Sequence, residues 1–220
     1  MQLIMSSSSP WNASFSTPEG RVIYITECPW RLDGRTATIH KLMPSQAIFG
    51  QGWPSMQDQF AQIGQVEFHS LSPSKITIGN SSYTSSTLFR RSGINLFGLG
   101  SDRVFTGFDG REYRWVMRQR KSELYLHDGT TLVAKYHLSH SGFIKEKSPP
   151  SLEITAQGEH MVDWIIITYV YIEKIRKERE KSLQKAEYEG GDGGEGGDGG
   201  DGGGGGGGDG GGGGDGGGGA

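Results

Sequence analysis

An apolar run that passes directly into a charged run constrains the fold of this chain more than any other feature. Residues 161–172 read MVDWIIITYVYI, and residues 173–180 read EKIRKERE. Apolar side chains surround the first part, which predicts a helix buried on all sides, whereas the second part is polar all round and predicts a solvated helix. Twelve residues rise only about 18 Å, against a hydrocarbon core of roughly 30 Å, so no transmembrane segment is expected. We therefore expect a core helix from about Gly158 to Ile172 and a charged helical extension over 173–189.

Nearly everything before this helix is typical of short β-strands. Alternating apolar and polar residues, separated by turn residues, predict strands at 21–26, 36–42, 64–69, 75–78, 103–106, 111–117, 123–126, 131–136 and 151–155. The pairs Asp109-Gly110 and Asp128-Gly129 predict hairpin turns between neighbouring strands. A mostly β fold of the α+β class follows, in which an antiparallel, barrel-like sheet closes around the buried C-terminal helix and so leaves no free edge.

Composition separates a globular body from a low-complexity tail. The tail, 190–220, holds 24 of the 38 glycines, six acids and no base. Such a segment cannot bury apolar surface, so we expect it to be disordered. The body has 22 Lys and Arg against 19 acids, a formal net charge of +3 that is too small to predict nucleic-acid binding. Before the tail we expect a flexible lead over 1–19 and a barrel domain over 20–172.

Cysteine content and the N-terminal residues bear on the cellular compartment. The single cysteine, Cys28, cannot form an internal disulfide. The apolar stretch Leu3-Ile4-Met5 is too short for the apolar region of a signal peptide. These features together predict an intracellular, cytoplasmic protein.

The segment from Gly158 to Arg179 resembles a fungal family catalogued as domain of unknown function 6593. Further resemblance lies in 102–115, DRVFTGFDGREYRW, and in 124–137, LYLHDGTTLVAKYH, and it spans most of residues 20–185. At the level of the fold, this family is similar to the tubby C-terminal, LURP-one and scramblase-like domains, in which an antiparallel barrel closes around a hydrophobic C-terminal helix. Some of those domains bind phosphoinositide headgroups. By analogy of fold, the resemblance implies lipid binding.

The best candidate for a binding surface is a row of basic side chains on the outward face of the strand at 111–117 and just beyond it. Its members are Arg114, Arg118, Arg120 and Lys121. Arg90 and Arg91 are possible additions to the row. Arginines at such positions can present several forked donors to a phosphate-rich headgroup or to an acidic peptide. The alternative is an ordinary solvated strand face, since exposed Arg and Lys are common.

Motifs for catalysis or metal binding do not occur in the sequence. It contains no Gly-x-Ser-x-Gly nucleophile motif, no His-Glu-x-x-His zinc motif and no Gly-Lys-Ser/Thr phosphate loop. The histidines lack the spacing of zinc ligands, and we interpret them as ordinary surface or capping residues: His127, His137, His140 and His160. We therefore expect no cofactor, no metal and no enzymatic activity.

Two functions remain after these exclusions. The first is a binding module for an anionic lipid headgroup or a protein partner. The alternative is a protein-interaction or scaffold role, in which the charged helix and the acidic glycine-rich tail make the contacts.

Overall fold

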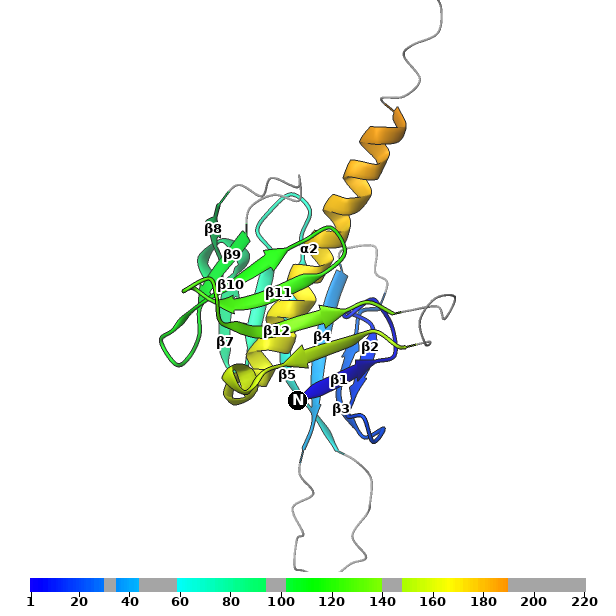
Figure 1. The fold of residues 1–220 in the computed structure, drawn as a ribbon, viewed down its shortest axis with the longest axis vertical. Coiled ribbons are helices and arrows are strands. Elements are labelled where there is room, and N and C mark those ends of the chain that lie inside the picture. The colour runs from blue at the N-terminus through cyan, green and yellow to red at the C-terminus, as the bar shows by residue number, and fades with distance from the viewer. Residues whose placement is uncertain (30–34, 44–58, 94–101, 140–147, 190–220) are drawn as a thin grey trace, which may run out of the picture.

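The computed structural model describes residues 1–29, 35–43, 59–93, 102–139 and 148–189. Figure 1 shows a strongly curved sheet around one long helix, α2, whose C-terminal part projects beyond the sheet. The described strands form one sheet in the order β7-β6-β5-β4-β3-β2-β1-β13-β12-β11-β10-β9-β8. Each pair of neighbours is antiparallel, so the predicted antiparallel, mostly β fold is confirmed.

The predicted strands are all present, with small shifts at their ends. In chain order the strands are β1 (Gln2–Met5), β2 (Ala13–Ser16), β3 (Val22–Glu27), β4 (Arg35–Leu42), β5 (Phe60–Phe68), β6 (Lys75–Ile78), β7 (Ser81–Thr84), β8 (Arg90–Ser92), β9 (Asp102–Thr106), β10 (Glu112–Met117), β11 (Ser122–Leu126), β12 (Leu132–His137) and β13 (Ser151–Ile154). The helices are α1 (Ser85–Leu88), the 3₁₀ helix η1 (Ala156–Met161) and α2 (Val162–Glu189). The predicted disordered tail, 190–220, and His140 lie outside the described residues.

The N-terminal lead differs from the prediction, because residues 1–19 contain two strands of the sheet. Strand β1 pairs with β13, with Leu3 opposite Leu152, and β2 pairs with β3. Leu3, Met5 and Phe15 are almost completely buried. A four-residue strand is too short to show a reliable alternation, and its stability comes from a partner about 150 residues away. Local composition therefore suggested a flexible lead where the tertiary structure has strands.

The sheet is not a closed barrel, which corrects the expectation of a sheet that closes around the helix and leaves no free edge. Strands β7 and β8 are its two edges. The one-turn helix α1 connects these edges, and its last residue, Leu88, and the following Phe89 are buried in the core. The Phe89 ring stacks on Tyr171 of α2, with 5.2 Å between ring centroids. Side-chain packing thus fills the seam that backbone hydrogen bonds would fill in a closed barrel.

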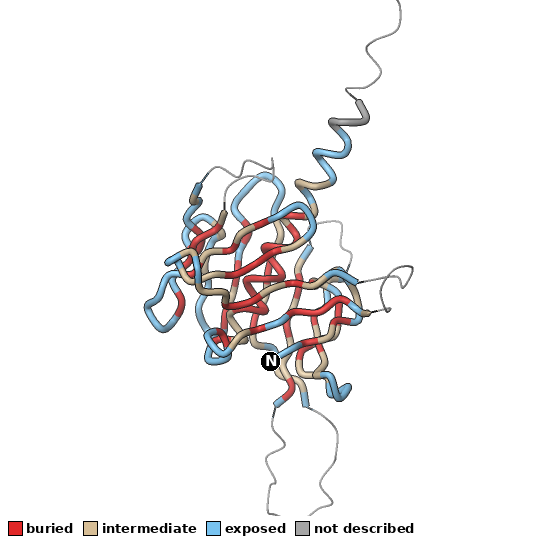
Figure 2. The backbone as a smooth tube through the Cα atoms, in the orientation of Figure 1, coloured by how far each residue is buried: buried red, intermediate tan, exposed pale blue. Residues whose placement is uncertain are grey.

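The apolar part of α2 is the centre of the core, as predicted. Its fully buried residues are Ile165, Ile166, Ile167, Tyr169, Val170 and Ile172. Strands from both halves of the sheet contact it: the Trp115 Nε1 of β10 donates a hydrogen bond to Thr168 at 3.1 Å, and the Tyr24 hydroxyl of β3 donates to Asp163 at 2.6 Å. Figure 2 shows this buried stretch inside the sheet and the exposed end of α2 outside it. No helix in the described ranges is long and apolar enough to span a membrane.

Gly64 allows β5 to approach this helix closely. A Cβ atom at this position would lie 2.5 Å from Cδ1 of Ile167 and 2.9 Å from the Thr77 carbonyl oxygen. Both distances are far below an ordinary carbon contact. The contact between sheet and helix therefore depends on the missing side chain.

We predict that Gly64→Ala lowers the free energy of unfolding by about 1–3 kcal/mol, because the added methyl group forces Ile167 and the backbone of β6 to shift. Urea denaturation of the single variant measures this loss. Ile167→Val removes the clashing Cδ1, so the double variant should be more stable than the sum of the two single losses. Additive losses, or a fully stable Gly64→Ala, would contradict this account of the interface.

Candidate anion-binding site

The charged run of α2 is not solvated where it begins, contrary to the prediction. Glu173 and Arg176 have side chains that are 0% and 3% exposed, and Lys174 is buried as well. Only over residues 181–185 is every residue of the helix exposed, among those whose burial is described. The polar sequence therefore does not mark the point at which α2 leaves the sheet.

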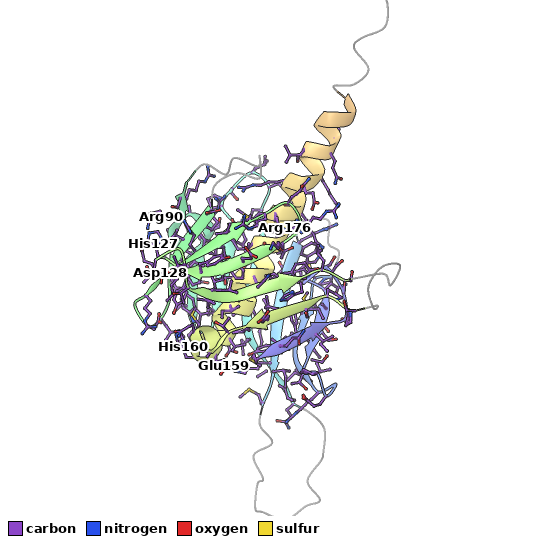
Figure 3. All side chains as sticks on the ribbon, in the orientation of Figure 1. Arg90, His127, Asp128, Glu159, His160 and Arg176 are labelled. Carbon is purple, nitrogen blue, oxygen red and sulfur yellow. The ribbon has the colours of Figure 1, made fainter. Side chains whose placement is uncertain are left out.

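A buried ionic network explains how these charges are accommodated. The Arg176 guanidinium donates to both carboxylate oxygens of Glu173 at 3.0–3.1 Å and to the Gln119 carbonyl oxygen at 2.7 Å. The Ser122 hydroxyl donates to Glu173 at 2.5 Å. Burial opposes the charge on Arg176, but attraction to Glu173 outweighs it and raises the pKa of Arg176 above its usual value. The network attaches α2 to the β10–β11 turn at the end of the sheet where the helix projects (Figure 3).

The basic row predicted from the sequence is partly neutralised within the fold. Arg118 and Lys121 both bind Glu123, at 2.9 and 2.8 Å, and the Glu123 side chain is only 5% exposed. Arg120 is exposed, and Arg114 is half-buried farther along β10. The structure thus brings Arg118 and Lys121 together around a carboxylate, and it does not join the four side chains into one free cationic surface.

A larger cationic site lies beside α2, in a cleft of about 1220 Å³. The loop between β5 and β6, the α1–β8 segment and one face of α2 line it. Its basic side chains are Arg35, Arg90, Arg91, Arg103, Lys174 and Lys181. Glu178 is the one acidic residue among the described lining residues, and it forms an ion pair with Lys174. Serine hydroxyls also line the cleft: Ser70, Ser72, Ser74, Ser85 and Ser86.

The cations of this cleft repel one another. Burial lowers the pKa of Lys174, and the neighbouring Arg35 lowers it further. Burial likewise lowers the pKa of Arg103, with added repulsion from Arg179 and Arg91. A like charge or a loss of solvation disfavours the charged form of a side chain. An anion in the cleft would offset both effects, so the arrangement is suited to a negatively charged ligand.

Sequence reasoning found only part of this cleft. Arg90 and Arg91 were candidates in the sequence, and the structure places them here, where Arg90 also binds Glu112 at 3.0 Å. Arg35 and Arg103 were missed, because they stand at the starts of two separate strands. The cleft residues that come from α2 lie on one face of the helix, because they are spaced three or four residues apart, and this spacing could have identified them in the sequence. They are Tyr171, Lys174, Ile175, Glu178 and Lys181.

The histidines form separate local contacts, and the cysteine is a partly buried free thiol. His127 lies 3.7 Å from Glu112, His137 lies 2.8 Å from Glu153, and His160 lies 3.0 Å from Asp109. Figure 3 shows His127 and His160 at different places on the molecule. Among the residues with described positions, no group of three or more His, Cys, Asp or Glu could hold a metal ion. Burial raises the pKa of the Cys28 thiol, which disfavours a reactive thiolate.

Fold and site together define a class of protein: an open antiparallel sheet wrapped around a helix, with a cationic cleft where the helix leaves the sheet. The chain belongs to the family of unknown function DUF6593, which it matches over residues 8–178. This range covers β2 to β13 and all of the basic cleft residues except Lys181. Neither the curated proteins nor the solved structures include a match to the chain.

Removing one partner of the buried ion pair tests the network. We predict that Arg176→Met lowers the free energy of unfolding by about 3–5 kcal/mol, because Glu173 is left as a buried charge without its cation. Replacing both residues, as Arg176→Met with Glu173→Met, should recover much of this loss. Chemical denaturation of both variants measures the difference. A single variant within about 1 kcal/mol of the wild type would show that the pair is not isolated from water.

Glu123 makes a separate contribution that depends on pH. Burial raises its pKa, but the ion pairs with Lys121 and Arg118 outweigh burial and hold the pKa below the usual 4.5. A depressed folded pKa stabilises the fold above about pH 4.5, and that stability is lost as the pH falls through the folded value. Glu123→Gln should therefore reduce the steepness of acid unfolding followed by circular dichroism. Glu27→Gln, at an exposed position on β3, is the control and should leave the acid limb unchanged.

Proposed function

We propose that this protein is a non-enzymatic module that binds the phosphate-bearing headgroup of an anionic phospholipid in the basic cleft. The observation that carries the proposal is the imbalance of six basic side chains against one acid around a single cleft. Guanidinium forks and ammonium groups are the usual protein partners of phosphate oxygens. The serine hydroxyls that line the same cleft supply further donors to such a ligand.

The rim of the cleft favours a lipid over a soluble phosphate compound. Leu71 lies in the loop between β5 and β6, lines the cleft and is fully exposed. An apolar side chain beside a cationic site can contact the acyl region of a membrane while the cations bind headgroups. Within a cell, anionic lipids are concentrated on the cytoplasmic leaflet. The proposal therefore places the protein in the cytoplasm, the compartment expected from its lone cysteine.

The chemistry of the cleft supports binding rather than catalysis. Its described lining contains hydroxyl groups, but a nucleophile needs an adjacent base. His69 is the histidine in the lining, and its Nδ1 lies 3.1 Å from the Pro73 carbonyl oxygen. That contact leaves Nε2 as the ring nitrogen that could act as a base, but no hydrogen bond joins it to a serine hydroxyl in the described lining. The proposed role is accordingly the recognition of an anion without a reaction.

A protein-interaction role is the second candidate. The residues of α2 from Lys181 to Lys185 are exposed and continue beyond the sheet. An exposed helical segment of mixed charge is a possible contact surface for another protein. Failure of the protein to bind any anionic membrane would favour this role.

Charge reversal in the cleft tests the headgroup proposal. We predict that Arg35→Glu with Arg91→Glu weakens binding to phosphoinositide-containing vesicles at least about tenfold, because two charge-assisted contacts become repulsive. Vesicle co-sedimentation at physiological salt is the measurement, with phosphatidylserine vesicles of equal charge for comparison. The control is Arg21→Glu with Arg111→Glu, which makes the same change of net charge at exposed positions outside both the cleft and the basic row.

Two further results decide between possible ligands. Leu71→Ser should weaken vesicle binding but leave binding of the soluble headgroup, measured by calorimetry, unchanged. A cleft variant that loses both kinds of binding identifies the cleft as the headgroup site. Equal losses in the cleft variant and in the Arg21/Arg111 control would reject the cleft and leave only nonspecific attraction to negative charge.

A further inference from the structure

We infer that the acidic, glycine-rich segment 190–220 of this chain occupies the basic cleft when no ligand is bound, and that it competes there with phosphate-bearing ligands. The competition rests on the proposed function. Occupancy of the cleft by the segment does not depend on that function, because it is argued from charge and chain geometry alone.

The charges of the two parts are complementary. The described lining of the cleft has six basic side chains and one acid. The segment has six acids and no base: Asp192, Glu195, Asp198, Asp201, Asp209 and Asp215. The first four recur at every third residue, so an extended chain presents one carboxylate about every 10 Å. The segment can therefore place several carboxylates along the cationic lining of the cleft.

The point of attachment brings the segment to the cleft. Helix α2 lines the cleft with Lys174 and Lys181 and ends at Glu189. At 1.5 Å per residue, its end lies about 12 Å beyond Lys181 and about 22 Å beyond Lys174. A glycine-rich chain of 31 residues has a root-mean-square span of about 30 Å, which covers both distances. Binding within one chain takes place at an effective concentration in the millimolar range.

Other cations of the described surface are less suitable partners for the segment. Arg118 and Lys121 bind Glu123, and Lys75 lies 3.2 Å from Glu67. In the cleft, six basic side chains share one acidic neighbour among the described lining residues, and burial and mutual repulsion lower the pKa values of Lys174 and Arg103. A carboxylate gains most where several cations stand close together. The cleft is therefore the preferred site for the acids of the segment.

A segment that occupies the cleft would make binding depend on how many negative charges the ligand carries. Each contact between an exposed carboxylate and a cation is weak, because water and salt screen it. A ligand with several phosphates can displace such contacts, whereas a ligand with a single negative charge competes poorly. The segment would thus favour multiply phosphorylated ligands over singly charged ones.

Neutralising the segment in the full chain tests the competition. The variant replaces its five aspartates with Asn and Glu195 with Gln, and a second variant with the five Asp→Glu changes retains the charge. We expect the neutral variant to bind phosphoinositide-containing vesicles about three- to tenfold more tightly at low salt, with the gain lost at high salt. The gain should also vanish in an Arg35→Gln, Arg91→Gln background. Equal affinities of the wild type and the neutral variant would overturn the competition.

A second measurement detects occupancy without any lipid. A carbodiimide condenses a carboxylate with a lysine amine that touches it, forming an amide while the reagent takes up the water as a urea. We expect cross-links from the segment to Lys181 and Lys174, lost when inorganic tripolyphosphate is added. Lys75 and Lys135, which do not line the cleft, are the internal controls.

The two measurements separate this inference from the proposed function. Cross-links to the cleft lysines without vesicle binding would uphold occupancy and reject the lipid proposal. A different pair of results would reject occupancy and leave the lipid proposal standing. Vesicle binding would then be the same for the neutral and the charged segment, and cross-links would either be absent or reach Lys75 and Lys135 as often as the cleft lysines.

Discussion

Burial of the apolar half of α2 is the interaction on which the rest of this structure depends. Six of its side chains are fully buried, and strands from both halves of the sheet contact this part of the helix. At roughly 1.5–3 kcal/mol for each large apolar side chain, this burial is a major part of the driving force for folding. The strong curvature of the sheet follows, because a flat sheet would cover only one side of the helix. Gly64 is part of the same constraint, since it removes the side chain that would hold β5 away from Ile167.

The cleft is a consequence of how that helix leaves the sheet. Because the sheet does not close, the connection between its edge strands runs through α1 and brings Arg90 and Arg91 next to the emerging helix. The Glu173–Arg176 network holds the helix against the β10–β11 turn on another side. Positive charge therefore gathers where apolar packing ends, and the helix that ends at Glu189 is one that lines the cleft. Recognition of an anion and competition by an attached acidic segment would share one structural origin.

Much of the fold was accessible to sequence reasoning, whereas the site was accessible only in part. Alternation along β10 placed Arg114 on the outward face, and the structure has the intervening Tyr113, Trp115 and Met117 buried. The same reasoning joined Arg114, Arg118, Arg120 and Lys121 into a row, and it could not foresee that Glu123 from the next strand binds two of them. Glu173 and Arg176 were expected in solvent, because the identity of a charged residue does not reveal which partner groups surround it. Strands β1 and β2 were missed for the related reason that their partners are distant in sequence.

By itself, the sequence determined nine of the thirteen described strands, the hairpin turns, the buried helix and the charge of its glycine-rich segment. These properties depend on neighbouring residues, through side-chain alternation, turn chemistry and composition. Only the tertiary structure decided that the sheet stays open, that residues 2–5 and 13–16 are strands, and that Arg35, Arg91, Arg103 and Lys174 line one cleft. Those outcomes depend on contacts between residues far apart along the chain, which local patterns do not encode.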